Sequence, residues 1–395
     1  MNEKTNKFLR RIQMKKKNLG AFIILASLGL AACSADTPST SSSSAAPVES
    51  SAPAATSESE ATTDVAITIA QGEDTTTALP EAGTLVMRQM YTAPHGTKSF
   101  AAVNVLMNGD TIVSAHLDEF QYLAPADFKG VPNADGGFGE SFPADVVLAS
   151  KAENNDGYSA MMKEKGGATQ TWAQSITAIT DFAKGKTVAD LEKAVADLEA
   201  LGEEGNPADV ISGATFSDSR GYLQAIVDTA KNGLVSIGAT TETTDLKEAQ
   251  LLGAPHGDKS FAMTTVAMDG DKVAAVFVDE FQFVDLTQFG GVPNSDSDFG
   301  AGVAEGVVLA SKVANNEAYS AMMKEKAGAT KTYADNMKAI QDFAIGKTVA
   351  ELEAAASELE ALGEEGNPAD VVSGATFSDS QGYLQAIIET AKLAK

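Results

Sequence analysis

Two segments with alternating apolar and polar positions lie on either side of a short turn in the first half of the chain. They run from Phe100 to Met107 and from Ile112 to Phe120, around Asn108-Gly109-Asp110. Such alternation predicts β-strands, and Asn-Gly or Asp-Gly between the strands is a strong hairpin signal. The pattern recurs around Asp269-Gly270-Asp271. We therefore expect an antiparallel strand pair in each half, with a further strand that includes Thr84 to Tyr91.

A glycine- and asparagine-rich loop, Gly130 to Gly139, follows the first predicted hairpin. After it, Lys, Glu, Met and Ala recur at helix-like spacing. This spacing predicts a helical region that starts near Ser150, and near Ser311 in the second half. Gly166 and Gly185 divide the region into shorter helices, and a further helix is expected near Val188 to Leu201. Two or more strands and several helices in each half predict the α+β class, with helices packed on an antiparallel sheet.

The two halves are copies of one sequence. His95 and His256, Asp118 and Asp279, and Tyr158 and Tyr319 are all separated by 161 positions. The offset holds without insertion from about 83–234 to 244–395, which we call the first copy and the second copy. A unit of this length can bury its own core, so the repeat predicts two tandem domains rather than a solenoid. Residues 235–247 are the expected linker.

The N-terminus has the character of a lipoprotein signal. Lysines 15–17 precede a short apolar run, which ends in Leu30-Ala31-Ala32-Cys33 and is too short to span a bilayer. This ending resembles the lipobox of bacterial lipoproteins, in which the cysteine receives a diacylglycerol and the preceding peptide is removed. We expect a signal over residues 1–32 and a lipidated Cys33. An ordinary cleavable signal with a chance cysteine is the alternative. Residues 33–64, rich in Ser, Thr, Ala and Pro, then form a disordered tether.

Charge and cysteine content narrow the function. The chain has a net charge of −25, and residues 1–32 carry seven Lys/Arg and one Glu, so removal of this +6 segment leaves −31. This charge argues against binding to nucleic acid or anionic lipid. Cys33 is the only cysteine, so the two copies contain no disulfide and no Cys-ligated metal, haem or iron–sulfur site. No metal site is expected.

One heptapeptide pattern occurs once in each copy. Asp-Val-Ile-Ser-Gly-Ala-Thr covers Asp209 to Thr215, and Asp-Val-Val-Ser-Gly-Ala-Thr covers Asp370 to Thr376. We call each heptapeptide the attachment motif. The triplet Gly-Ala-Thr alone is not informative, because it also ends at Thr169, Thr240 and Thr330 without the preceding serine and aspartate. Only the complete pattern distinguishes the two sites.

The surroundings of Thr215 favour a phosphate group. Ser217, Asp218 and Ser219 are good N-cap residues, so a helix is expected to start one to three residues after the threonine. Free amides at a helix N-terminus attract phosphate, and Ser-Gly-Ala gives an unhindered backbone. The alternative to a phosphate site is an ordinary connection between a loop and a helix, in which the small residues serve only to cap the helix. Asp209 would repel a phosphate and is interpreted as a recognition or metal-binding element used during attachment.

The attachment motif closely resembles that of the FMN-binding domain family. In that family a flavin transferase moves FMN from FAD onto the threonine through a phosphoester bond. The resemblance implies attachment at Thr215 and Thr376. The other motif residues that it implies for cofactor binding are Asp209, Ser212, Gly213, Ala214, Asp370, Ser373, Gly374 and Ala375. With the lipobox and tether, the chain is similar to flavinylated lipoproteins of Gram-positive extracellular electron transfer.

Several side chains are candidates for contact with the flavin ring, and each is also a candidate for ordinary packing. The aromatic candidates are Phe216 and Phe377, Phe138 and Phe299, and Trp172 with its counterpart Tyr333. His95 and His256 lie in exposed Pro-His-Gly loops and either contact the flavin, relay protons or face solvent. The pairs Asp118-Glu119 and Asp279-Glu280, at a strand end, either bond the flavin ring or face solvent, and we expect them to face solvent. His116 is matched by Phe277, so it is not a shared group.

The resemblance implies an electron carrier on the extracellular face of the membrane, held there by its lipid anchor only. It would carry two covalent FMN groups and take electrons from a membrane quinol or an NADH dehydrogenase. It would pass them to external acceptors such as ferric iron or to a reductase, and it would itself be a substrate of the flavin transferase rather than an enzyme. A ligand-binding surface lipoprotein without flavin is the main alternative. A flavin-dependent extracellular reductase is a second, and release of the signal fragment as a signalling peptide is compatible with each.

Overall fold

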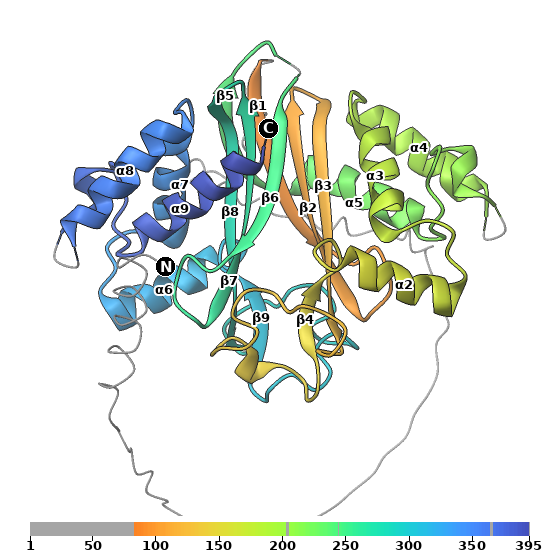
Figure 1. Ribbon diagram of the computed structural model, residues 1–395, viewed down its shortest axis with the longest axis horizontal. Coiled ribbons are helices and arrows are strands. Elements are labelled where there is room, and N and C mark those ends of the chain that lie inside the picture. Colours follow the sequence, from red (N-terminus) through yellow and green to blue (C-terminus); the bar gives the residue numbers. More distant parts are fainter. Residues whose placement is uncertain (1–82, 203–204, 244, 364–365, 395) are drawn as a thin grey trace, which may run out of the picture. The chain divides into compact units, whose positions relative to one another are not determined.

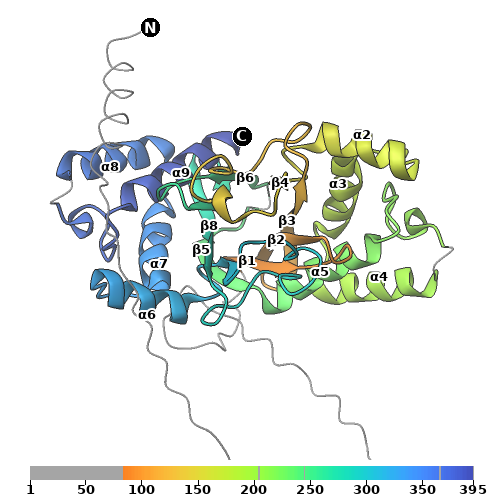
Figure 2. The same ribbon diagram turned by 90° about the horizontal axis from the view of Figure 1, so that it is seen from below.

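A computed structural model of the protein describes residues 83–395 apart from 203–204, 244, 364–365 and 395. The expected signal, lipidated Cys33 and tether lie outside the described residues. The described chain is of mixed α+β class, with two antiparallel sheets that pack on one another and helices on both outer flanks (Figures 1 and 2). The α+β prediction is confirmed. None of the helices in the described ranges combines the length and apolar character needed to cross a bilayer.

The first copy forms a five-stranded sheet in the order β4-β3-β2-β1-β5. Its elements are β1 (Thr84–Thr92), β2 (Ser99–Asn108), β3 (Thr111–Leu123), the 3-10 turn η1 (Gly139–Ser141), β4 (Val147–Ser150), α2 (Asn155–Gly166), α3 (Trp172–Ala183), α4 (Val188–Ala200), the 3-10 turn η2 (Pro207–Asp209), α5 (Ser219–Asn232) and β5 (Leu234–Thr240). Strand β5 lies in the segment expected to be a linker and pairs with β1.

The second copy repeats this order in a four-stranded sheet, β6-β7-β8-β9. Its elements are β6 (Lys247–Gly253), β7 (Ser260–Asp269), β8 (Lys272–Asp285), β9 (Val307–Ser311), α6 (Asn316–Ala327), α7 (Tyr333–Ala344), α8 (Val349–Leu362), the 3-10 turn η3 (Pro368–Asp370) and α9 (Ser380–Leu393).

The predicted hairpins are confirmed as β2–β3 and β7–β8, and the helix near Val188 is α4. The predicted helix start near Ser150 and Ser311 is wrong. Each of these serines is the last residue of a short strand, and the helices begin at Asn155 and Asn316. The apolar runs before the serines pair with β3 and β8. A run this short has no periodicity that separates a strand from a helix.

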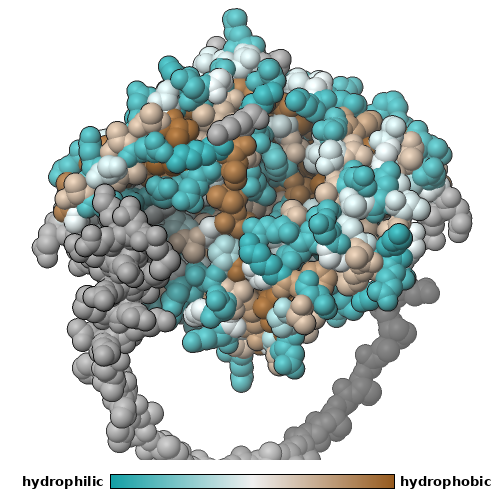
Figure 3. Space-filling view, in the orientation of Figure 1, coloured by the Kyte–Doolittle hydropathy of each residue, from teal (hydrophilic) through white to brown (hydrophobic). Residues whose placement is uncertain are grey.

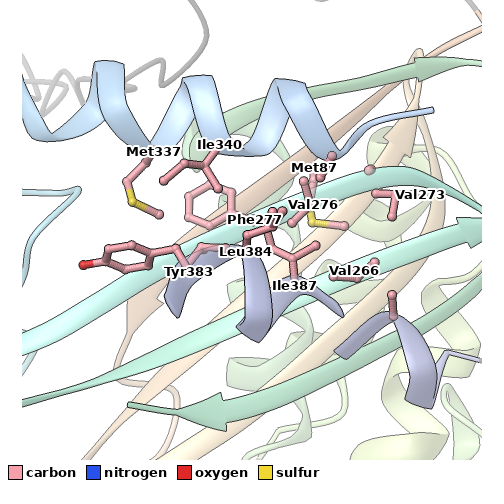
Figure 4. Close-up of a cluster of buried hydrophobic side chains, with 14 of the residues drawn as sticks. Met87, Val266, Val273, Val276, Phe277, Met337, Ile340, Tyr383, Leu384 and Ile387 are labelled. Atoms are coloured by element: carbon pink, nitrogen blue, oxygen red, sulfur yellow. The ribbon is translucent and has the colours of Figure 1, made fainter. Parts of the chain in front are cut away.

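Each sheet buries one face under its own helices. In the first copy, α3 and α5 pack on the sheet and α4 packs on α5, around Ile179, Leu191 and Ile226. In the second copy, α7 and α9 pack on the sheet in the same way, and Figure 4 shows Phe277, Met337 and Leu384 in that core. Met337 and Leu384 occupy the positions of Ile176 and Leu223 in the first copy, so the duplicated sequence yields a duplicated layer of helices on the sheet. The cluster in the second copy also includes Met87 and Leu234 of the other half of the chain.

The faces between the sheets form a core that both copies share. It consists of positions related by the 161-residue offset: Phe100, Ala102, Phe120, Val131, Phe138 and Leu148, with Phe261, Met263, Phe281, Val292, Phe299 and Leu309. The rings of Phe261 and Phe281 stack at 4.9 Å, and Phe120 lies 5.8 Å from Phe261 across the two copies. This core joins the two copies through apolar contact.

The glycine- and asparagine-rich loops exchange hydrogen bonds between the copies. The Asn133 amide donates to the carbonyls of Gly257 and Ser260, at 2.9 and 2.7 Å. Asn294 donates in the same way to Gly96 and Ser99, also at 2.9 and 2.7 Å. Both asparagines have positive φ angles, 64° and 66°, a conformation that asparagine tolerates better than most residues. The pairing of the copies is thus reciprocal in its loops.

Strand β5 and residues Met87 and Tyr91 of β1 make contacts with the second copy that have no counterpart in the other direction among the described residues. A Cβ added to Gly238 of β5 would lie 2.6 Å from the Ala274 carbonyl oxygen of β8, so only glycine allows this approach. Met87 of β1 lies among second-copy side chains in Figure 4. The Tyr91 hydroxyl donates to Asp279. On the face in Figure 3, hydrophilic residues (teal) and apolar residues (brown) are interspersed.

Candidate functional site

The attachment motif forms a tight loop between η2 and α5, and its small residues have steric reasons to be small. Gly213 has a φ of +89°, and a Cβ there would lie 3.3 Å from the Cβ of Ala178 on α3. Ala214 is completely buried, whereas Thr215 is exposed. In the second copy Gly374 has a φ of +93°, Ala375 is buried and Thr376 is exposed. The loop therefore presents one threonine hydroxyl at the surface of each copy.

Helix α5 begins at Ser219 after the N-cap Asp218, one residue later than the latest start that the sequence predicted. Phe216 to Asp218 separate Thr215 from the helix. The Ser219 hydroxyl donates to the Phe216 carbonyl at 2.7 Å and fixes this connection. Asp209 and Ser212, like Asp370 and Ser373, are exposed. Their side chains are accessible to another protein.

A pocket of about 640 Å³ opens beside Thr215. Its lining residues are His95, Tyr158, Met161, Met162, Lys165, Gly166, Gly167, Ala168, Thr169, Trp172, Thr215, Phe216, Ser217, Asp218 and Tyr222. Pockets for small molecules usually measure about 300–1,000 Å³ and combine aromatic walls with a few polar groups. The four aromatic rings, the methionines and the threonine hydroxyl at this pocket fit a planar aromatic group attached through the threonine.

A buried ion pair lies behind this pocket. Lys151 Nζ is 2.8 Å from Glu119 Oε2, and both side chains are completely buried. Glu119 also accepts hydrogen bonds from the hydroxyls of Ser99 and Tyr222. Burial, together with the negative charge of Glu119, raises the pKa of Tyr222 well above its usual value. His95 Nδ1 lies 3.4 Å from the Tyr222 hydroxyl and links the ion pair to the pocket.

The second copy repeats this arrangement with closer contacts. Lys312 Nζ is 2.8 Å from Glu280 Oε2, and the Tyr383 hydroxyl donates to the same oxygen at 2.5 Å. His256 Nδ1 lies 3.2 Å from Lys312 Nζ. Burial acts to raise the pKa of Glu280, but the charges and hydrogen bonds of Lys312 and His256 outweigh it and lower the pKa to about 2. Glu280 is thus ionised at any physiological pH.

The prediction that Asp118-Glu119 and Asp279-Glu280 face solvent is wrong. All four side chains are buried, since β3 and β8 are central strands covered on both faces. Asp118 accepts from Ser150 Oγ and from the backbone amides of Glu119 and Ala152. Burial raises the pKa of Asp118, and likewise that of Asp279, to about 6, although these hydrogen bonds act in the opposite direction.

The two aspartates should make stability depend on pH. Each aspartate has a pKa of about 6 in the folded protein, above the usual 3.8. Its contribution to the free energy of unfolding is therefore complete below pH 4 and is lost as the pH rises through 6. Two pKa units correspond to about 3 kcal/mol for one group. We expect the free energy of unfolding measured in urea to change less between pH 4.5 and 7 in Asp118→Asn than in the original protein. An unchanged pH dependence would contradict the assignment, and Asp181→Asn, at an exposed position of α3, is the control.

The other predicted contact residues divide into two groups. His95, Trp172 and Phe216 line the pocket. Tyr333 and Phe377, the counterparts of Trp172 and Phe216, lie 5.5 Å apart, and Phe377 lies 6.0 Å from Tyr383. Phe138 and Phe299 do not line this pocket, because they belong to the core between the copies. His116 lies 3.7 Å from Glu248 of the second copy.

Sequence reasoning missed Lys151 and Lys312, which it assigned to the helical region. The signal that was available is their position directly after the run Val-Val-Leu-Ala-Ser, repeated at the 161-residue offset. A lysine adjoining a buried strand needs a buried acid as partner, and Glu119 and Glu280 lie on the neighbouring strands. Among residues in the described ranges, no group of three or more His, Cys, Asp or Glu is arranged to hold a metal ion.

Comparison with models of known protein families, with curated proteins and with solved structures finds no match. The protein is therefore described by its own fold and site. It is an α+β protein with two antiparallel sheets, and each of its two copies presents an exposed threonine beside buried aromatic side chains and a buried Lys–Glu pair.

Proposed function

We propose that the protein is a membrane-anchored extracellular electron carrier with FMN attached covalently to Thr215 and Thr376. The observation that carries the proposal is the exposed Thr215 hydroxyl at the edge of an aromatic pocket, within a motif that resembles a flavin attachment site. The attachment motif is present twice, and the glycine of each motif has a positive φ, 89° at Gly213 and 93° at Gly374. A bound flavin supplies one- and two-electron chemistry, while the protein positions the ring.

The residues at the pocket have distinct parts in this proposal. Trp172, Tyr158 and Phe216 offer apolar faces for a ring, and Thr215 offers the covalent link. Lys165 supplies a positive charge, while Asp218 would repel a nearby phosphate. His95 and Tyr222 connect the pocket to Glu119 by polar contacts. The exposed Asp209 and Ser212 are left for recognition by the transferase.

The electron donor in this proposal is a membrane quinol or an NADH dehydrogenase, and the acceptor is ferric iron or a reductase. Lipid attachment at Cys33 would keep the carrier at the extracellular face of the membrane, and a flexible tether would raise its local concentration near a membrane donor. The same pocket would also suit a surface lipoprotein that binds an aromatic ligand without covalent attachment, and this is the competing function.

Covalent flavin is tested by producing the full chain together with a flavin transferase and measuring its intact mass. We expect two FMN adducts, one adduct in Thr215→Ala or Thr376→Ala, and none in the double variant. Thr169→Ala is the matched control, because Thr169 is exposed, follows Gly-Ala and lines the same pocket. It should retain both adducts. An unmodified mass beside an active transferase would exclude the carrier and favour the ligand-binding lipoprotein.

A further inference from the structure

The two threonines have different hydrogen-bonding neighbours. Thr215 Oγ1 lies 3.0 Å from Ser175 Oγ, and either hydroxyl can be the donor. The position equivalent to Ser175 in the second copy is Asn336, which is completely buried. Asn336 Oδ1 accepts from the Thr376 backbone amide at 2.6 Å and from the Thr376 hydroxyl at 3.0 Å. The hydroxyl in the second copy is therefore held as a donor.

The Asn336 side chain is fixed in this orientation by its other contact. Its Nδ2 donates to the Thr332 carbonyl at 3.0 Å. In a flipped amide the NH₂ group would face the Thr376 backbone N–H, so that one donor faces another. The amide oxygen would face the Thr332 carbonyl, so that one acceptor faces another. The network thus leaves Asn336 Oδ1 as an acceptor only, opposite Thr376.

Esterification changes what each threonine oxygen can do. The oxygen of a phosphoester has no proton and can only accept a hydrogen bond. Ser175 can rotate its hydroxyl and donate to the ester oxygen of Thr215, so this contact survives. In the second copy the ester oxygen of Thr376 would face Asn336 Oδ1, and the hydrogen bond between them would be lost.

We propose that Ser175 and Asn336 determine the order of flavin attachment, with Thr215 modified before Thr376. This inference rests on the proposed function. In the reaction, the threonine oxygen forms a bond to the FMN phosphorus of FAD. The bond between that phosphorus and the oxygen bridging to the AMP phosphate breaks. AMP leaves with the bonding electron pair, and the hydroxyl proton passes to the transferase or to water. Loss of one ordinary hydrogen bond corresponds to a rate difference of about fivefold.

Lys331 has the opposite effect to Asn336, because it favours modification of Thr376. Its ammonium donates to the Gly374 carbonyl at 2.7 Å, and its charge attracts the anionic phosphates of the flavin nucleotide. The equivalent residue in the first copy is the neutral Gln170. Lys331 is exposed, so water and salt screen its charge. Lys331→Gln separates this electrostatic effect from that of Asn336, and it should slow modification of Thr376 further.

The test uses the full chain, produced without transferase and then treated with a limiting amount of flavin transferase and FAD. Peptide mass spectrometry follows each threonine over time. We expect Thr215 to be modified about fivefold faster than Thr376, in line with one hydrogen bond. Asn336→Ala should accelerate modification of Thr376, because it removes a hydrogen bond that only the free hydroxyl makes. Ser175→Ala removes a contact that is present before and after esterification, so it should leave the rate at Thr215 nearly unchanged. Ser175→Asn, which places the second copy's side chain beside Thr215, should slow modification of Thr215. Circular dichroism of each variant identifies any loss of fold.

Equal rates at the two threonines, or rates that do not respond to Asn336→Ala and Ser175→Asn in folded protein, would overturn the proposed order while leaving covalent flavin intact. The same holds if Thr376 is modified first. Adducts on neither threonine would overturn the proposed function, and this inference with it.

Discussion

Replacement of Lys151 by methionine is expected to lower the free energy of unfolding by about 3–5 kcal/mol, the usual effect of removing one partner from a buried ion pair. Methionine has a similar length and fills most of the same volume, so the effect arises from charge. The Glu119 carboxylate would remain buried with the hydroxyls of Ser99 and Tyr222 as hydrogen-bond donors and with His95 Nδ1 at 3.9 Å. Urea unfolding of the flavin-free protein measures the change.

A double-mutant cycle identifies the ion pair as the cause. In Lys151→Met with Glu119→Gln, both charges are absent, and much of the lost stability should return. Lys193→Met on α4 is the control, because this exposed lysine pairs with Asp197 at the surface and should change stability by less than about 1 kcal/mol. If the double variant is less stable than Lys151→Met, then packing, not charge, explains the loss.

Replacement of Phe261 by alanine is expected to destabilise both copies together, by about 3–5 kcal/mol. Phe261 belongs to the second copy, but its ring contacts Phe120 and Phe138 of the first copy at centroid distances of 5.8 and 5.3 Å. Trp172, the only tryptophan, lies in the first copy. Its fluorescence therefore reports the first copy alone, and far-UV circular dichroism reports both.

The two signals should give one coincident transition in the original protein, and Phe261→Ala should shift both equally. Leu286→Ala is the matched control in the second copy, because this leucine is 53% exposed and should change little. A fluorescence transition that stays in place while the circular dichroism transition shifts would show that the copies unfold independently.

The sequence alone predicted the structural features that depend on residues close together in the chain. Asn-Gly and Asp-Gly turns between alternating segments predicted both hairpins, and Thr187 begins α4 with the capping pattern expected of a helix start. The motif glycine was predicted to leave the backbone unhindered, and Gly213 has a positive φ, a conformation that glycine adopts readily. Each of these features depends on neighbours within a few residues, and such neighbours are visible in the sequence.

The sequence was insufficient where residues far apart meet. Glu119 looks like a solvent-facing strand residue until Lys151 and Tyr222 are placed beside it. Phe138 looks like a ring contact in an open loop, yet the Asp258 carbonyl of the other copy accepts its backbone amide at 2.8 Å. The alternation of β3 does not distinguish burial under helices from burial under a second sheet. These positions depend on how the copies pair, and no local pattern encodes that pairing.

The reciprocal loops and shared phenylalanine core have a consequence for repair. In an assembly of separate subunits, a damaged subunit dissociates and an intact one takes its place. Here both partners belong to one polypeptide, so pairing is independent of protein concentration and neither copy can be replaced by a fresh one. A deamidated Asn133 in one copy therefore stays with its neighbour for the life of the chain. Turnover of the whole molecule is the only way to restore it.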